Sequence, residues 1–479
     1  MQRMPSKKTT NTTYSILLLL ALLSTLFSFS VQASIDEGRA TLLAVYQEAL
    51  SNDAQLLAAR HHYESLKEKV PQARAGLLPT LNSSVRSAAV TQEASSTSRS
   101  RTDSVFQANL IQPVLRTDRW FQLDAAQATV TKDQFELLAK EQLLILSVAQ
   151  AYFETLRALD RVAATKAEET ALQRQQLQAQ GRLANGAANL TDVLEAKAAH
   201  DNATANRKLA ERKVGDAFGH LSRLTNRAYS SIEGIRHQLP IVAPKPGEAD
   251  AWVDQAVQQN LSLQASELAV VAAEHSLLQR KAGFAPTVDA VISYRKGNSE
   301  AMGGLNQRGD ISQRSIALEL NIPLYSGGMV RSQVREATEQ LTRSQYEKED
   351  RLRETVLTTR NLHRSVNSDV EQVVARRQSI HSSQASVQAN KVGWQMGSRN
   401  FSDVLNAQRQ LYTVVREYNN ARYDFIINTL KLKQAAGLLS PADLKSLSAY
   451  LSSNYDFERD FLPPEGLRTN LPLIDKDAS

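Results

Sequence analysis

The sequence predicts a mainly α-helical fold with a small set of β-strands, in which one structural unit occurs twice. Three observations predict this fold. Short motifs recur at a nearly constant separation, a few segments alternate apolar and polar residues, and two very long stretches keep a helical periodicity. With only 13 prolines and 19 glycines in 479 residues, the composition suits long uninterrupted elements.

Three pairs of matching motifs reveal the repeat. Residues 74–81 (RAGLLPTL) match 281–288 (KAGFAPTV), 112–115 (QPVL) match 322–325 (IPLY), and 189–196 (NLTDVLEA) match 400–407 (NFSDVLNA). The separation drifts only from 207 to 211 residues, as small loop insertions would cause. Each unit has the same order: a helical stretch, two alternating segments, a very long helix, a hairpin turn and a shorter helix.

The repeats and the two ends divide the chain into four parts. The first residues have the pattern of a secretory signal: three basic residues, an apolar run over about 16–27, and a small-residue cleavage site (VQA) ending at Ala33. We therefore predict a signal peptide over 1–33, a first repeat over 34–240 and a second repeat over 241–451. A polar tail over 452–479 should be loosely packed after about Asn454.

Composition excludes several classes of protein. The net charge is +6, and the signal carries three of these charges, which leaves about +3 on the mature chain. Basic and acidic residues are interspersed along predicted helices, so nucleic acid is not an expected partner. The chain has no cysteine, which excludes disulfides, thiolate metal sites and a cysteine nucleophile. The mature part has no run of some 18 apolar residues that would predict a transmembrane helix.

The alternating segments predict β-strands with one polar face. In the second repeat the apolar residues are Ile316, Leu318, Leu320 and Ile322, and in the first they are Phe106, Ala108 and Leu110. Weaker alternation covers 81–89 and 288–294. Each pair of segments is joined by a stretch rich in serine, glycine and charge, over 92–103 and 296–310, which we expect to form exposed hairpin loops.

The two long helices are expected over about 116–182 and 329–395. At 1.5 Å per residue each would be roughly 100 Å long, which no compact domain requires. The first helix carries two adjacent apolar seams, one through Ile145, Ala149 and Tyr152 and the other through Leu144 and Val148. A helix with two seams has a neighbour on each side, as in a cylinder of helices.

Four strands in one chain cannot close a membrane barrel, because the smallest such barrels have about eight strands. An open sheet edge in lipid would leave backbone groups unpaired. The chain must therefore oligomerise if its strands meet lipid. Three copies would supply about 12 strands and about 12 columns of helices, enough to enclose a water-filled bore. The predicted fold is thus mainly α with a transmembrane β-barrel: a trimeric 12-stranded β-barrel continued by a 12-helix α-barrel.

At these motifs the sequence resembles the TolC family of outer-membrane efflux and type I secretion channels. The resemblance covers the mature chain to about Leu451, and it is carried by the repeated AGxxPT motifs, the Gln/Ile-Pro motifs, YSGGMV at 325–330, AYF at 151–153 and the two DVL motifs. It implies a homotrimer in the outer membrane with its tunnel in the periplasm. It also implies a collar of small elements, here over 232–239 and 441–451.

The resemblance further implies a passive exit duct for drugs or polypeptides, without enzymatic activity or cofactor. Its expected partners are outer-membrane lipid, a periplasmic adaptor protein and an inner-membrane transporter of the RND or ABC type. A periplasmic coiled-coil adaptor or an envelope scaffold is the alternative, although neither explains duplicated strand segments. The exported substrate is left open, because a passive duct takes its specificity from the pump.

The resemblance also assigns roles to the hairpin tips. A gate latch would involve Thr191, Asp192, Trp394 and Arg399, and a pore constriction would involve Asp403 and Asn406. The family usually has tyrosine where Trp394 stands, and the indole N–H can donate a hydrogen bond to a carboxylate but cannot accept one. The family often has a second acidic residue where Asn406 stands, so the mouth of this chain should hold cations more weakly. Adaptor hairpins would dock at Gly186, Ala187, Ala188, Gly397 and Ser398.

A structural role is the alternative for the two tip aspartates. Asn189 and Asn400 stand at plausible N-cap positions, and an acid three residues later is favoured by capping geometry and by the helix dipole. Such a helix start at a pore mouth can also serve as a gate. Elsewhere, none of the eight histidines forms a ligand-spaced pair, and no nucleophile or phosphate motif is present. We therefore expect neither a metal site nor catalysis.

Overall fold

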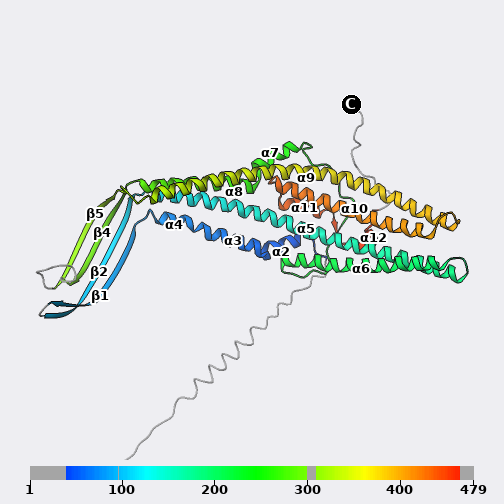
Figure 1. Ribbon diagram of the computed structural model, residues 1–479, viewed down its shortest axis with the longest axis horizontal. Coiled ribbons are helices and arrows are strands. Elements are labelled where there is room, and N and C mark those ends of the chain that lie inside the picture. Colours follow the sequence, from blue (N-terminus) through cyan, green and yellow to red (C-terminus); the bar gives the residue numbers. More distant parts are fainter. Residues whose placement is uncertain (1–38, 95–96, 299–308, 464–479) are drawn as a thin grey trace, which may run out of the picture. The chain divides into compact units, whose positions relative to one another are not determined.

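The computed structural model describes residues 39–94, 97–298 and 309–463. The predicted signal peptide and the end of the predicted tail lie outside these residues. The described residues from Ala40 to residue 463 belong to one compact unit. Its elements follow the predicted order twice (Figure 1). The first set comprises α2 (Leu42–Asn52), α3 (Ala54–Lys67), α4 (Lys69–Ala75), β1 (Thr80–Ala94), β2 (Thr97–Leu115), α5 (Thr117–Ala184) and α6 (Leu190–Thr225).

The second set repeats this order with the same kinds of element. It comprises α7 (Ala249–Gln259), α8 (Leu261–Lys281), β4 (Thr287–Asn298), β5 (Asp310–Asn321), α9 (Met329–Gln395) and α10 (Phe401–Ala435). The long helices α5 and α9 have 68 and 67 residues, so each is about 100 Å long. Among the described helices, none is long and apolar enough to cross a bilayer.

The four long strands form one antiparallel sheet in the order β1-β2-β4-β5. The pairing of β2 with β4 joins the two repeats. Strands β1 and β5 lie at the two edges, and neither edge has a further partner in the part of the chain that the structure describes.

The strands are longer than the sequence predicts. We expected a loop over 92–103, but β1 and β2 stay paired as far as Ala94 and Thr97. The prediction was wrong because alternation of apolar residues marks a strand only where one face is apolar, and this end of the hairpin is polar. In the second hairpin the strands extend to Asn298 and restart at Asp310, and 299–308 lies outside the described residues.

The helices pack side by side in four columns. Helix α5 packs against α3 and α4 near the sheet and against α6 further on. On its other side α5 contacts α8 and then α10, and both of these pack against α9. The order of columns is therefore α3–α4–α6, then α5, then α8–α10, then α9 (Figure 1). The first and the last columns are the edges of this helical layer.

A group of small elements covers the middle of the helices on one side, and we call it the collar. It consists of α2, β3 (Gly234–Ile235), α11 (Pro441–Ser448), β6 (Leu451–Ser452) and α12 (Phe457–Asp460). Strand β3 pairs with β6, and Ala40 bridges to Ile232. The Tyr152 hydroxyl of α5 lies 3.0 Å from the carbonyl oxygens of both Ala40 and Glu233. The collar and the middle of α5 and α10 share the largest apolar core.

We expected the chain to be loosely packed after about Asn454, but the described residues beyond it are well packed. Tyr455 and Phe461 are only 4% and 5% exposed, and the Asn419 amide donates a 2.9 Å hydrogen bond to the Phe461 carbonyl. The prediction failed because the apolar residues of this segment are few and have no regular spacing. They nevertheless fit a gap between β3 and α10. The tail thus belongs to the collar as far as residue 463.

Candidate functional site at the hairpin tips

Two similar turns form the ends of the helical hairpins. Gly186 and Gly397 have φ values of 71° and 77°, a left-handed conformation that glycine adopts without steric cost. The Ala187 N–H donates to the Arg182 carbonyl at 2.8 Å, and the Ser398 N–H donates to the Gly393 carbonyl at 2.8 Å. These bonds satisfy carbonyls at the ends of α5 and α9 and reverse the chain.

The two tip aspartates differ in their local bonding. Asn400 and Asp403 form a capping box in which the Asn400 N–H donates to an Asp403 carboxylate oxygen at 3.3 Å. Asn189 is likewise the N-cap of α6, but its side chain makes no cap hydrogen bond. Within the described residues the Asp192 carboxylate has no hydrogen bond or ion pair either. The capping interpretation therefore holds for Asp403, whereas it leaves Asp192 free for another contact.

Trp394 joins the two hairpins. The guanidinium carbon of Arg182, in the last turn of α5, lies 4.4 Å from the centre of the Trp394 ring. On the same ring, Phe401 packs with a centroid separation of 5.1 Å. Such a cation–π contact contributes about 0.5–1 kcal/mol when exposed and more when partly buried. Within the described part of one chain, Trp394 thus contributes to the tip through its ring, which contacts Arg182 and Phe401.

A small apolar cluster supports this contact. It contains alanines of α5 and α6 and two side chains of α10, and its buried members are Leu172, Ala179, Ala196, Ala199, Ala203, Phe401 and Leu405. Most of these residues are alanines, so the helices approach closely, and separating them would expose little apolar surface. The apolar contribution to holding the tips together is therefore small.

The remaining predicted site residues lie at the surface of the tips. Thr191, Arg399 and Asn406 are exposed, and Asp192 is half-buried. No ion pair joins Asp192 to Arg399 in the described part of this single chain. Four of the five predicted docking residues are exposed and Ala188 is half-buried, so these turns are accessible: Gly186, Ala187, Ala188, Gly397 and Ser398.

Sequence reasoning missed Arg182 and Gly393. Arg182 stands four residues before the turn glycine, where a basic side chain favours the C-terminal end of a helix. Gly393 occupies the matching position in the second repeat. A Cβ atom there would lie 2.8 Å from Cγ of Arg399, so only glycine leaves room for that side chain. The difference between the matching positions in the two repeats could have identified both residues.

Comparison with known proteins identifies relatives over most of the chain. A model of the family described as outer membrane efflux protein matches residues 45–227 and 252–438. The chain is 30% identical over 416 residues to the outer membrane protein TolC of Vibrio cholerae serotype O1, an alignment that covers 86% of this chain and 93% of that protein. It is 27% identical over 420 residues to the alkaline protease secretion protein AprF of Pseudomonas aeruginosa, with 85% and 86% covered.

Solved structures share the fold at lower identity. The similarity to CusC has a TM-score of 0.75 with 16% identity and covers 83% of this chain and 92% of that chain. The similarity to the outer membrane protein VceC of Vibrio cholerae has a TM-score of 0.73 with 17% identity, and covers 83% and 96%.

Proposed function

This chain belongs to the outer membrane efflux protein family, and we propose that three copies of it close into one duct, a 12-stranded β-barrel continued by a 12-helix α-barrel. The protein is an outer-membrane exit duct for efflux or type I secretion. One observation carries this proposal. Each open edge strand of the sheet is directly connected to a helix in an edge column of the helical layer, so the same two sides of the chain are open along its length. Strand β1 leads from the α3–α4 column, and β5 leads into α9.

The two open edges of the sheet favour closure by further copies. Bilayer hydrocarbon cannot hydrogen-bond the backbone groups of β1 and β5, so each edge requires a partner strand. Four strands are half of the number in the smallest known barrels and a third of the number in the proposed barrel, so one chain cannot close a barrel alone. Joining β5 of one copy to β1 of the next satisfies both edges, and three copies leave a bore.

The two faces of the sheet differ as a lipid-facing and a water-facing surface should. On one face, Leu81, Leu110, Ile292 and Ile316 stand in one row across all four strands. On the other face, the next row is Asn82, Asn109, Ser293 and Ser315. Leu81 and Ile316 are 71% and 83% exposed, which is costly in water and favourable in lipid.

The collar belongs on the outside of this duct. Twelve helices about 10 Å apart would form a ring about 38 Å across between helix axes, which leaves a bore of about 28 Å. Three collars, each with three helices and a pair of strands, would fill that bore. The opposite face of each helical layer would therefore line the passage.

Closure also brings the predicted latch residues of different chains together. Asp192 lies in the first turn of α6, and Arg399 lies just after the end of α9. The columns that contain α6 and α9 are the two edges of the helical layer. The α6 edge of one copy would meet the α9 edge of the next. The Asp192 carboxylate and the Arg399 guanidinium, which have no ion pair among the described residues of one chain, would then pair between chains, with Thr191 beside them. The Arg182–Trp394 contact would hold the two hairpins of each chain together.

The rest of the mouth would act through its charge and its accessible turns. Asp403, already fixed as a cap, would contribute one carboxylate per chain to the constriction, and Asn406 would contribute a neutral side chain. The exposed turns at Gly186–Ala188 and Gly397–Ser398 would receive a periplasmic adaptor, which links the duct to an inner-membrane transporter of the RND or ABC type. Membership of the family argues against the alternative of a periplasmic adaptor or an envelope scaffold.

Single-channel conductance in planar bilayers tests both the duct and the latch. We expect the wild type to conduct weakly and Asp192→Ala/Arg399→Ala to conduct several-fold more. Asp250→Ala/Arg360→Ala is the matched control, because it removes a 3.0 Å acid–arginine pair at the surface of α7 and α9, far from the tips. Failure of the wild type to insert would contradict the duct, and an equal rise in the control would contradict the latch.

A further inference from the structure

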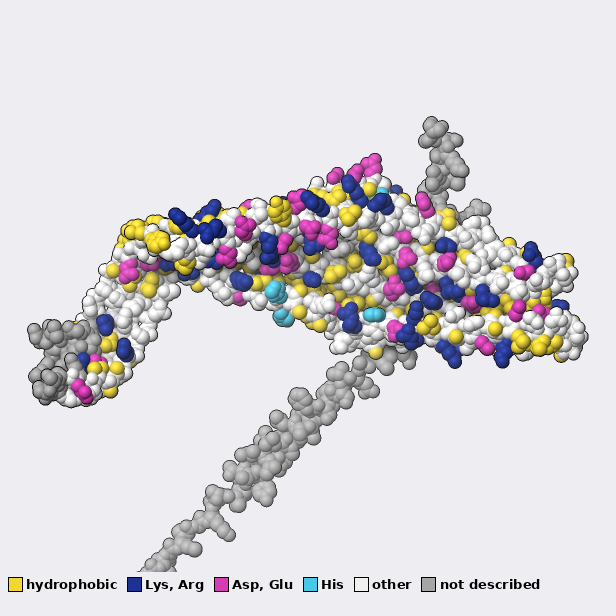
Figure 2. Space-filling view, viewed as in Figure 1, with side chains coloured by type: hydrophobic (Ala, Val, Ile, Leu, Met, Phe, Trp, Pro, Cys, Tyr) yellow, Lys and Arg dark blue, Asp and Glu magenta, His cyan; other side chains and the backbone are white. Residues whose placement is uncertain are grey.

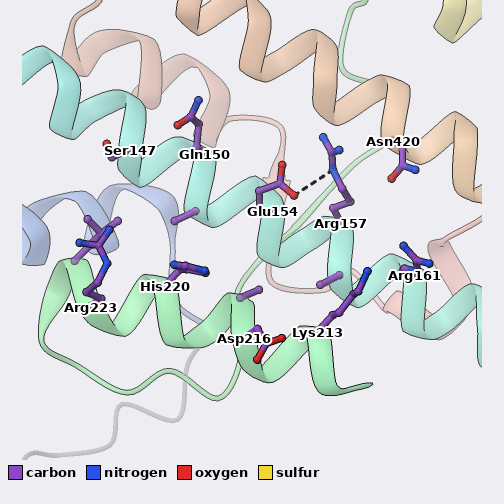
Figure 3. Close-up of a pocket in the computed structure, with 14 residues that line it drawn as sticks. Ser147, Gln150, Glu154, Arg157, Arg161, Lys213, Asp216, His220, Arg223 and Asn420 are labelled. Carbon is purple, nitrogen blue, oxygen red and sulfur yellow. Dashed lines mark ion pairs between the residues drawn. The ribbon is translucent and has the colours of Figure 1, made fainter. Parts of the chain in front are cut away.

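A cleft between α5 and α6 carries more positive than negative side chains, and the latch does not use it. Its volume is about 620 Å³, and Asn420 of α10 closes one side (Figure 3). Four basic side chains line it, against two acidic ones: Arg157, Arg161, Lys213 and Arg223, against Glu154 and Asp216. In Figure 2, basic side chains lie along the region that α5 and α6 occupy in Figure 1.

The acidic residues of the cleft already have partners. Glu154 lies 3.5 Å from Arg157, and Arg157 also donates a 2.6 Å hydrogen bond to Asp424. Asp216 pairs with Arg212 at 3.2 Å, one turn away on α6. The two acids therefore do not neutralise the other three cations of the cleft.

Arg161, Lys213 and Arg223 are exposed and have no ion pair within the part of the chain that the structure describes. In Figure 3, Lys213 extends from α6 toward α5 at the end of the cleft where Arg161 lies, and Arg223 lies at the other end. Like charges held around one cleft raise the local positive potential and attract anions. Charge-assisted hydrogen bonds from arginine and lysine to an oxyanion are about twice as strong as neutral ones.

The cleft opens on the face opposite the collar. Tyr152 binds the collar, and Glu154 follows it by two residues, which is about 200° around the helix. Ala158 and Arg161 lie on the same stripe as Glu154. If the collar is on the outside of the trimer, as the proposed function requires, three copies of this cleft face the bore at one level.

We propose that the cleft is an anion-binding site in the bore, formed by Arg161 and Lys213 at one end. Arg223 stands ten residues from Lys213 on α6, about 15 Å along the helix, and adds positive charge at the other end. The site takes clustered oxyanion groups, phosphate or carboxylate, carried by the molecules that pass through the duct. This inference rests on the proposed trimer. It concerns the middle of the passage and is independent of the latch at the tips.

Block of the ionic current by tripolyphosphate tests the site. The anion is added to trimers in planar bilayers on the side where the barrel opens. In Arg161→Gln/Lys213→Gln we expect the half-blocking concentration to rise about tenfold, because two of the unpaired cations of each cleft are lost. The control Lys245→Gln/Lys445→Gln removes the same charge from two exposed positions, one in the loop before α7 and one on the collar helix α11. We expect its half-blocking concentration to stay within about twofold of the wild type.

The outcomes separate this inference from the proposed function. Channels of normal conductance that tripolyphosphate blocks equally in wild type and Arg161→Gln/Lys213→Gln would overturn the anion site alone. The same would follow if tripolyphosphate did not block the wild type, or if the control changed as much as the cleft variant. Absence of channels in every protein would overturn the duct itself.

Discussion

The guanidinium of Arg182 stacks on the ring of Trp394 and joins the tips of the two hairpins within one chain. Residues from opposite repeats thus hold the tips together without an ion pair. The apolar cluster behind them consists largely of alanines. Small changes in energy at this contact should therefore affect whether the hairpins separate.

Arg182→Ala should increase the fraction of time that the channel is open, because it removes the cation from the Trp394 ring. Trp394→Leu should have a similar effect, and the double variant should not exceed either single variant by much. A coupling of about 1 kcal/mol corresponds to roughly a fivefold difference in the opening equilibrium. Single-channel recording of the four proteins measures it. Additive effects would contradict a direct contact, and Arg343→Ala, an exposed α9 arginine, is the control.

Burial of Asp160 should make stability depend on pH. The carboxyl group is 2% exposed and accepts a 2.7 Å hydrogen bond from Tyr423. Burial raises its pKa to about 6, above the ordinary value of 3.8. The folded state then holds its proton more tightly than the unfolded state, so this group favours folding below about pH 4 and loses that contribution as pH rises to 6.

Asp160→Asn should therefore become more stable relative to the wild type as pH rises from 4 to 7. The expected relative gain is on the order of 2–3 kcal/mol. Urea-unfolding midpoints of the protein in detergent at several pH values measure it. If the variant instead loses stability at pH 7, the ionised carboxylate is stabilised by the buried Arg422 nearby, and the predicted sign is wrong.

His237 should give the opposite dependence. Its Nε2 lies 2.7 Å from the Asp460 carbonyl, and burial lowers its pKa to about 3 from 6.5. The unfolded state then takes up a proton more readily, so stability is lost as pH falls below about 6.5, by up to about 1.4 kcal/mol per pH unit. His237→Gln keeps a donor for Asp460 and should flatten the acid limb of the stability profile. An unchanged acid limb would contradict this assignment.

Gly234→Ala should loosen the C-terminal segment. A Cβ atom at Gly234 would lie 2.2 Å from the Tyr455 ring, so the ring must move. Overpacking of this kind costs about 1–3 kcal/mol. Limited proteolysis should then cut near residues 455–461 sooner than in the wild type. In a Tyr455→Gly background the same substitution should add little, because the ring and the Tyr455 Cβ atom, which would lie 2.7 Å from the new Cβ, are both gone. An equal added effect there would refute the explanation.

Much of the fold could be predicted from the sequence because it depends on periodicity over long stretches. The helix expected over 329–395 has those bounds, and that over 116–182 is shifted by one and two residues. Because the structural unit occurs twice in the sequence, each kind of element could be predicted from two separate stretches. The polar ends of β1 and β2 were missed because they are held by backbone pairing between strands, which leaves no apolar pattern in the sequence.

The site was harder to predict because its contacts join distant residues. Asn400 and Asp403 are three residues apart, so their capping could be predicted from local spacing. Arg182 and Trp394 are far apart in sequence, and only the packing of one hairpin on the other brings them together. Tyr455 was missed for the same reason, because its space is created by Gly234, in another part of the chain.

The mass of the purified complex tests the central claim most directly. Native mass spectrometry after release from detergent should give three copies of the mature chain, because both edges of each sheet are then paired. A stable complex of one or two copies would contradict the closed duct, since β1 and β5 would stay open or the barrel would have too few strands for a bore.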